Sequence, residues 1–196
     1  MPDRYAHCTF CGARFTPGQP WPRRCAACGE TSYLNPKPVA VVLQPVGAGW
    51  PVRAGSPLLA SSPVLAGSPV LAGSAVGGGS PAGAGLLVVR RGIPPARDRL
   101  ALPGGFIEVD ETWQEAAVRE LSEETGLTAD PSSVRLFDTL SAPDGTLLVF
   151  GLLPQVESVP DFRANDETLA LEILPAPAEL GFSLHTQVAD RFFASV

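Results

Sequence analysis

Short apolar runs separated by glycine, proline and polar residues predict a chain rich in β-strands. Six runs have the length and apolar content of strands: 38–46, 85–91, 100–105, 134–140, 146–153 and 169–174. The run at 100–105 ends in two glycines, which predict a turn. Pro143-Asp144-Gly145 lies between two of the other runs, and an Asp-Gly pair in that position predicts a β-hairpin.

Two further segments follow the periodicity of an α-helix. The first, 113–125, begins after Thr112, which forms a capping-box pattern with Glu115, and it stops at Gly126, a typical C-terminal cap. The second, 185–195, predicts a terminal helix whose core-facing side chains are Val188, Ala189, Phe192 and Phe193. Strands mixed with two helices indicate an α/β sandwich.

An insertion at about 47–84 interrupts the strand pattern. Residues 56–73 hold three copies of a six-residue repeat that begins with Ser-Pro. A β-helix coil is one interpretation, but such solenoids need more copies, and proline removes a ladder donor from each copy. A flexible Gly/Ser/Pro/Ala-rich insertion is the favoured interpretation. The apolar runs on either side then form a strand pair of one domain, because loop-closure entropy grows slowly with length.

Length and charge limit the classes of function. The 196 residues suffice for one ordinary domain and a small module, and the net charge of −6 disfavours bulk nucleic-acid binding. No apolar stretch reaches the roughly 18 residues of a membrane span without glycine or proline. Residues 1–8 contain no apolar signal core. We therefore expect a cytoplasmic protein with no membrane partner.

Three glutamates in the predicted helix 113–125 are the main chemical signal. Glu120, Glu123 and Glu124 are spaced i, i+3, i+4 and therefore share one helical face. Carboxylates in such a group repel one another at neutral pH, and a hard cation such as Mg²⁺ or Mn²⁺ would hold them together. Taken alone, the three glutamates are more often a solvated acidic face that binds no metal.

The residues around these glutamates match a known motif, the Nudix box. Its pattern is glycine, five residues, glutamate, seven residues, arginine-glutamate, an aliphatic residue, any residue, two glutamates, any residue, glycine and an aliphatic residue. The fixed positions are all filled here, by Gly105, Glu111, Arg119, Glu120, Leu121, Glu123, Glu124, Gly126 and Leu127. The chain therefore resembles the Nudix hydrolases.

The resemblance implies a Nudix-type α/β/α sandwich with a mixed sheet over 35–196. It implies an enzyme that cleaves a phosphoanhydride bond in a nucleoside diphosphate linked to another moiety. The implied ligands of catalytic Mg²⁺ or Mn²⁺ are Gly104, through its carbonyl, and Glu120, Glu123 and Glu124. Arg119 would orient these carboxylates, and Glu111 would support the loop before the helix.

Nudix proteins often take a further carboxylate from a loop beyond the box. Glu167 precedes the last predicted strand and is the candidate, as a metal ligand or general base. The alternative is an ordinary surface carboxylate at a strand end. The expected catalytic residues are Glu111, Arg119, Glu123 and Glu167. Arg90 and Arg91, just before the box, are candidate phosphate contacts.

The N-terminal segment 1–34 holds all four cysteines of the chain in two Cys-x-x-Cys pairs: Cys8, Cys11, Cys25 and Cys28. Two such pairs supply four thiolates tetrahedrally, which suits structural Zn²⁺ and leaves no open position. Two disulfides or unpaired thiols are the alternatives, and disulfides are disfavoured in a cytoplasmic protein. We therefore expect a zinc ribbon before the Nudix domain. His7 is not needed as a ligand, and His185 is expected to begin or pack the last helix.

A zinc ribbon before a Nudix domain is similar to the architecture of NADH pyrophosphatases. That branch carries Ser-Gln-Pro-Trp-Pro-Phe-Pro-x-Ser after the box, whereas this chain has Ser-Ala-Pro-Asp-Gly-Thr at 141–146. A special preference for NADH is therefore not expected. The alternatives are a non-hydrolysing nucleotide sensor, disfavoured by the intact box, and a nucleic-acid module, disfavoured by the acidic charge. Nudix proteins are frequently homodimers, and the expected small-molecule partner is a nucleotide.

Overall fold

The computed structural model describes residues 5–47 and 85–195 of the chain. The chain divides into two compact units, unit 1 (Met1–Lys37) and unit 2 (Pro38–Val196). The expected flexible insertion at about 47–84 lies, beyond its first residue, outside the described residues. No helix in the described part of the chain is long and apolar enough to cross a membrane.

Unit 1 has little regular structure and a small core. Its strands β1 (Arg23–Arg24) and β2 (Thr31–Ser32) form one antiparallel pair. The buried core consists of Cys8, Phe15 and Cys25. Trp21 makes edge contacts with the rings of Tyr5 and Phe15, at 6.0 and 6.2 Å between centroids. So small a core cannot by itself stabilise a module of this length.

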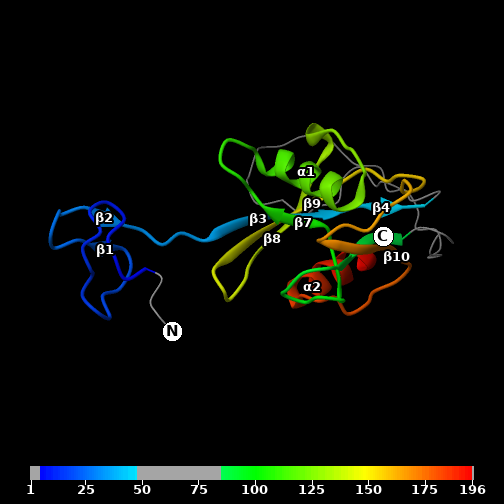
Figure 1. Cartoon of the computed structure of the whole chain (residues 1–196). Coiled ribbons are helices and arrows are strands. Elements are labelled where there is room, and N and C mark those ends of the chain that lie inside the picture. Colours follow the sequence, from blue (N-terminus) through cyan, green and yellow to red (C-terminus); the bar gives the residue numbers. More distant parts are fainter. Residues whose placement is uncertain (1–4, 48–84, 196) are drawn as a thin grey trace, which may run out of the picture. The chain divides into compact units, whose positions relative to one another are not determined.

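Unit 2 contains all the longer elements (Figure 1). Its strands are β3 (Lys37–Leu43), β4 (Pro45–Val46), β5 (Gly85–Arg91), β6 (Leu100–Ala101), β7 (Gly104–Phe106), β8 (Arg135–Ser141), β9 (Thr146–Leu152) and β10 (Thr168–Leu174). Its helices are α1 (Trp113–Thr125), the 3-10 turn η1 (Pro131–Ser133) and α2 (Ser183–Ala194). The last three strands match the sequence prediction within a residue at each end.

The strands of unit 2 form two sheets. One has the order β10-β5-β4, with β6 also paired to β5, and the other has the order β7-β3-β9-β8. The chain crosses between the sheets at Gln44 and again at residues 102–103. The prediction of single strands at 38–46 and 100–105 is therefore wrong, because each run is divided between the two sheets. An apolar run does not reveal that its two halves have different neighbours.

The strand pair on either side of the insertion is confirmed. Strands β4 and β5 pair antiparallel, with Pro45 opposite Leu86 and Val46 opposite Gly85. The bridge between Val46 and Val156, in contrast, is parallel. Pairing in unit 2 is therefore mixed, as the family resemblance implies.

Alternate residues of β3 face opposite layers of unit 2. Ala40 and Val42 belong to the core cluster under α1, whereas Val41 and Leu43 belong to the cluster that contains Phe192 of α2. These four side chains of β3 are all fully buried, which explains why this part of the strand is apolar without alternation. Figure 1 shows α1 and α2 on opposite sides of the strands. The expected α/β/α sandwich is confirmed.

Local signals set the ends of α1. The side chain of Thr112 accepts from the N–H of Glu115, the Glu115 carboxylate accepts from the N–H of Thr112, and Gly126 adopts a left-handed conformation at the C-cap. Helix α2 starts at Ser183, two residues before the predicted start, because the N–H of Thr186 already donates to the carbonyl of Phe182. Of its predicted core residues, three are fully buried and Phe193 is half-buried.

Candidate active site and zinc centre

The acidic face of α1 lies against the glycine turn that begins β7. The N–H of Gly104 donates to Oε2 of Glu124 at 2.9 Å, and Glu124 is only 5% exposed. A Cβ added to Gly105 would lie 2.3 Å from Oε1 of Glu120. Only a residue without a side chain therefore lets this carboxylate approach the strand so closely. Glu120 and Glu124 are called here the two inner carboxylates.

Arg119 is hydrogen-bonded to three of the predicted site carboxylates. Its Nε and Nη2 donate to the two carboxylate oxygens of Glu111, at 3.1 and 2.7 Å. Its Nη1 donates to Glu120 at 2.8 Å and to Glu123 at 3.1 Å. Its Nη2 also donates to the carbonyl of Phe106 at 3.0 Å. The bidentate bond lowers the pKa of the Glu111 carboxyl, so this partner of Arg119 stays charged.

Burial raises the pKa of both inner carboxylates. The pKa of Glu124 rises to about 7, mainly by burial; the hydrogen bond from Gly104 opposes this rise, whereas the charges of Glu120 and Glu167 add to it. Burial also raises the pKa of Glu120, against the opposing effect of Arg119. Burial thus disfavours the charged form of both carboxylates, and a bound cation would stabilise that form.

The carboxylates of α1 do not converge on one point in this structure. Among the described residues, only the cysteine cluster places three or more metal-type donor atoms within 4.8 Å of one another. Glu120 and Glu123 instead pair with Arg119. The donor chemistry nevertheless fits Mg²⁺ or Mn²⁺, because these ions prefer carboxylate and carbonyl oxygens. A divalent ion would compete with Arg119 for the same oxygens.

The loop before β10 brings a fourth carboxylate to α1. The charge of Glu167 raises the pKa of both inner carboxylates, so it lies within electrostatic range of each. Asn165 shapes this loop, because its Oδ1 accepts from the N–H groups of Glu167 at 3.0 Å and Thr168 at 2.7 Å. Its Nδ2 donates to the carbonyl of Glu123 at 3.3 Å. The sequence prediction missed Asn165, although asparagine in a loop is the usual signal of such a turn.

The two candidate phosphate contacts have different surroundings. Arg90 donates to Glu172 at 3.0 and 2.5 Å and to a backbone carbonyl at 2.7 Å, so its charge is already paired. Arg91 lowers the pKa of Glu124, which places its charge near the inner carboxylates. Its guanidinium lies 5.2 Å from the centroid of the Phe182 ring. Arg91 is therefore the better placed of the two to meet an anionic ligand.

The four cysteines of unit 1 lie close enough together to bind one metal ion. Their Sγ atoms lie within 4.8 Å of one another, with separations of 3.8 Å for Cys8–Cys28 and 3.6 Å for Cys11–Cys25. Sulfurs placed tetrahedrally at about 2.3 Å from zinc are about 3.8 Å apart. A disulfide would require about 2.0 Å, and all four cysteines are free. The cluster thus fits the expected zinc ribbon.

Both Cys-x-x-Cys pairs sit in the same kind of backbone turn. The N–H of Cys8 donates to the carbonyl of Ala13, and the N–H of Gly12 donates back to Cys8, at 2.8 and 3.0 Å. The second pair repeats these bonds at 2.8 and 2.9 Å, from Cys25 and Gly29. Gly12 and Gly29 have φ values of +74° and +78°, which glycine adopts without strain. Repetition of the turn brings the four sulfurs together.

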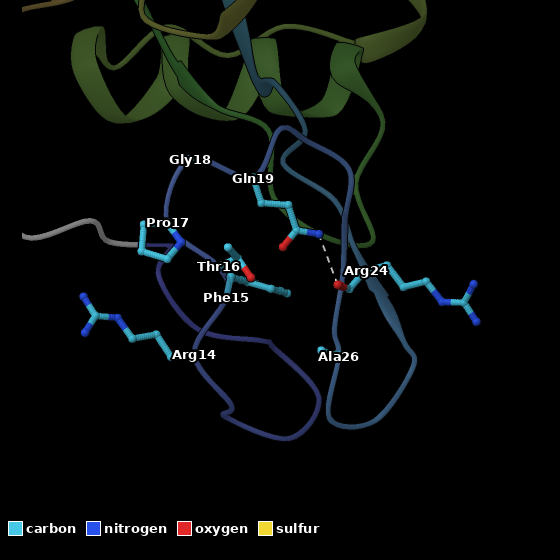
Figure 2. A pocket seen from close by; sticks show the side chains of 8 residues that line it. All are labelled: Arg14, Phe15, Thr16, Pro17, Gly18, Gln19, Arg24 and Ala26. Atoms are coloured by element: carbon cyan, nitrogen blue, oxygen red, sulfur yellow. Dashed lines mark hydrogen bonds between the residues drawn. The ribbon is translucent and has the colours of Figure 1, made fainter.

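A pocket of about 480 Å³ lies in unit 1, and none of the predicted catalytic residues line it. Its lining residues are Arg14, Phe15, Thr16, Pro17, Gly18, Gln19, Arg24 and Ala26. Figure 2 shows the side chains of Arg14 and Arg24 extending away from each other, while Gln19 is bonded to the carbonyl of Arg24 at 3.1 Å. The charged side chains of this pocket do not point toward one another, so the acidic face of α1 remains the candidate active site.

The α/β/α fold and the glutamates of α1 can now be compared with known families. The NUDIX domain family model matches residues 77–195, more than half of the chain. The chain therefore belongs to the Nudix family.

Relatives share shorter stretches. The ADP-ribose pyrophosphatase of Methanocaldococcus jannaschii is 46% identical over 59 residues, which are 30% of this chain and 34% of that protein. The phosphatase NudJ of Escherichia coli K12 is 50% identical over 68 residues, 34% of this chain and 44% of that protein. The chain thus spans less than half the length of either relative. A NUDIX hydrolase from Nitrosomonas europaea shares the fold, with a TM-score of 0.61 at 21% identity over 96% of this chain and 90% of that one.

Proposed function

We propose that this chain hydrolyses a phosphoanhydride bond in a nucleoside diphosphate linked to another moiety. The observation that carries the proposal is the packing of the two inner carboxylates against the turn at Gly104 and Gly105. We propose that Mg²⁺ or Mn²⁺ binds there to Glu120, Glu123, Glu124 and the carbonyl of Gly104. Bound metal would neutralise phosphate oxygens and lower the pKa of an attacking water.

The remaining site residues would position the metal ligands, accept a proton and bind a phosphate of the substrate. Before metal binds, Arg119, itself held by Glu111, would keep Glu120 and Glu123 in place, and the metal would then replace its hydrogen bonds to these carboxylates. Glu167 is exposed and lies on a loop tied to α1, which suits a general base that takes the proton of the attacking water. The water oxygen bonds to phosphorus, the bridging P–O bond breaks, and two phosphorylated products leave. Arg91 would pair with a phosphate of the substrate.

We propose a purely structural role for Zn²⁺ in unit 1. Four cysteine ligands leave no coordination position for water or substrate. The ribbon proposed at 1–34 supplies no side chain to the mechanism above, and the proposed Nudix domain at 35–196 carries the chemistry. A cytoplasmic location and a homodimer remain predictions.

The substrate class is tested with a panel of diphosphate-linked nucleotides. ADP-ribose belongs in the panel because one relative is an ADP-ribose pyrophosphatase, and FAD and NADH test other linked moieties. Chromatography of the products, with Mg²⁺ or Mn²⁺ added, should show a nucleoside monophosphate and a second phosphorylated product. NADH should not be strongly preferred, because the post-box segment departs from the NADH pyrophosphatase signature at Ala142. Tight nucleotide binding without turnover on the whole panel would instead support a sensor.

A further inference from the structure

We propose that His185 is a positioning residue of the candidate active site, which holds the turn at Gly104 through a hydrogen bond to Leu102. His185 lies in α2, on the opposite layer of the sandwich from the acidic helix. The consequence for metal binding rests on the proposed function, because Gly104 is a proposed ligand. The hydrogen bond itself does not depend on that function.

The N–H of Leu102 is bound from outside the sheets. At this residue the chain has left β6 in one sheet and has not yet entered β7 in the other. Leu102 is only 2% exposed, and its N–H donates to Nδ1 of His185 at 3.2 Å. A buried N–H that loses its acceptor strongly destabilises the folded state. His185 is thus the acceptor that this crossing requires.

Three elements hold three successive residues of this segment. The N–H of Leu102 is bound by α2 through His185. The carbonyl of residue 103 accepts from the N–H of Val42 in β3 at 2.8 Å. The N–H of Gly104 is bound by α1 through Glu124 at 2.9 Å. Loss of the bond to α2 would release the turn on one side and shift the carbonyl proposed to bind metal.

The surroundings of His185 fix both the orientation of its ring and its protonation state. The side chain is 7% exposed and lies against the rings of Phe150 and Phe182, at 5.8 and 5.0 Å between centroids. Because Nδ1 accepts a hydrogen bond, the ring proton resides on Nε2. Burial, together with the charge of Arg91, lowers the pKa of His185 to about 3. The imidazole therefore stays a neutral acceptor throughout the neutral range.

The other crossing between the sheets is built in the same way and provides a matched control. Gln44 is 2% exposed, and its Nε2 donates to the carbonyls of Pro45 and Pro154, both at 2.9 Å. At both crossings a buried polar side chain is hydrogen-bonded to the backbone. Gln44 has no hydrogen bond to the segment 102–104 in the described structure, so its loss should affect stability alone.

The test compares His185→Leu, His185→Asn and Gln44→Leu. In the asparagine variant Oδ1 stands where Nδ1 stood, so the acceptor is kept. Titration of Mn²⁺ by electron paramagnetic resonance should show weaker binding for His185→Leu by about tenfold or more, the size typical of residues that support metal ligands. His185→Asn should recover most of this affinity, and Gln44→Leu should match the wild type despite a lower melting temperature.

Equal Mn²⁺ affinity for His185→Leu and the wild type would overturn the proposal, as would an equal loss in Gln44→Leu. A second measurement needs no variant that might unfold: nitrogen NMR of the wild-type imidazole should show a proton on Nε2 and none on Nδ1. A proton on Nδ1 would also overturn it. If the wild type bound no Mn²⁺ at α1, the proposed function would fail, while the NMR result would still decide the bond between His185 and Leu102.

Discussion

Glu124 of α1 accepts a hydrogen bond from the backbone N–H of Gly104 at 2.9 Å. This bond joins the helix that carries the box glutamates to the turn that precedes β7. Glu124 is nearly fully buried, so neighbouring charges act on its carboxylate with little screening by water. Its position makes Glu124 the most informative residue for testing both the chemistry and the electrostatics of the site.

Replacing Glu124 by glutamine should abolish most of the activity without unfolding the chain. Glutamine has nearly the same size and helix propensity, but it removes a full negative charge from the proposed metal site. We expect kcat/KM to fall by roughly 10²–10⁴-fold, because metal activation supplies several kcal/mol. Steady-state kinetics at ordinary and at raised Mn²⁺ would check this, and partial relief at high Mn²⁺ would identify weaker metal binding as the cause.

The matched control is Glu115→Gln, which removes the same charge from the same helix. Glu115 serves in the capping box of α1, and glutamine can still accept the hydrogen bond from Thr112. Turnover of this variant should stay close to that of the wild type. Near-normal turnover of Glu124→Gln at ordinary Mg²⁺ would contradict the metal site and favour the sensor alternative.

Two neighbouring glycines should respond differently to alanine. At Gly105 the new Cβ would meet the flexible carboxylate of Glu120, at 2.3 Å from Oε1. The carboxylate must move, so we expect about a tenfold or larger loss of kcat/KM with little change in melting temperature. At Gly104 the Cβ would meet the backbone carbonyl of Ala40 at 2.3 Å, which cannot yield easily. Gly104→Ala should therefore destabilise the fold by about 1–3 kcal/mol.

Kinetics together with thermal unfolding of both glycine variants separate these effects. A stable, fully active Gly105→Ala protein would show that the close approach of Glu120 to the strand is not needed for catalysis. A Gly104→Ala protein as stable as the wild type would show that β7 can shift away from β3.

Without added Mg²⁺ or Mn²⁺, the buried Glu124 should make the protein less stable as the pH rises. Its pKa is raised from 4.5 to about 7 in the folded chain, so between these values the folded state holds a proton that the unfolded state has lost. The stabilisation is fully present below the lower value and is lost as the pH rises through the higher one. The loss should reach about 3 kcal/mol by pH 8.

Comparison with Glu124→Gln isolates this effect from other titrations. The free energy of unfolding of the variant minus that of the wild type should increase between about pH 5 and pH 8. Added Mn²⁺ should restore the wild type at the higher pH, because a bound cation stabilises the ionised carboxylate. A difference that does not change with pH would show that Glu124 titrates normally.

Unit 1 should contain one zinc ion and unfold without it. Its buried core of Cys8, Phe15 and Cys25 is too small to stabilise it alone, so metal binding must supply the folding free energy. Elemental analysis should find one zinc per chain in the wild type and none in Cys8→Ser. His7→Ala is the control and should keep its zinc. Absence of zinc from wild-type protein purified under reducing conditions, with the cysteines oxidised, would contradict the ribbon.

The insertion should be dispensable for activity. Val46 and Gly85 are paired across β4 and β5, so the two chain ends that the insertion joins are already adjacent. Replacement of residues 50–82 by a short Gly/Ser loop should leave turnover within a few-fold, as measured on the best substrate of the panel. Loss of folding or of all activity in this variant would show that the insertion contributes to unit 2 or its site.

Features of the chain that depend on near neighbours were predictable from the sequence. The start and end of α1 follow from Thr112, Glu115 and Gly126, whose interactions are all made within a few residues. The turns around the cysteines are likewise local, so their spacing predicted the cluster in unit 1. The family resemblance adds the α/β/α order of layers, which composition and periodicity alone leave open.

Only the tertiary structure decided how distant segments meet. The crossing at Gln44, the loop held by Asn165 and the bond from Leu102 to His185 each depend on partners tens of residues away. Hydrophobic periodicity carries no information about such partners, because it reports only which side of an element is buried. Charge placement is also tertiary: Glu120 and Glu124 lie on the same helical face as Glu123, yet packing against the glycine turn buries Glu124, half-buries Glu120 and leaves Glu123 exposed.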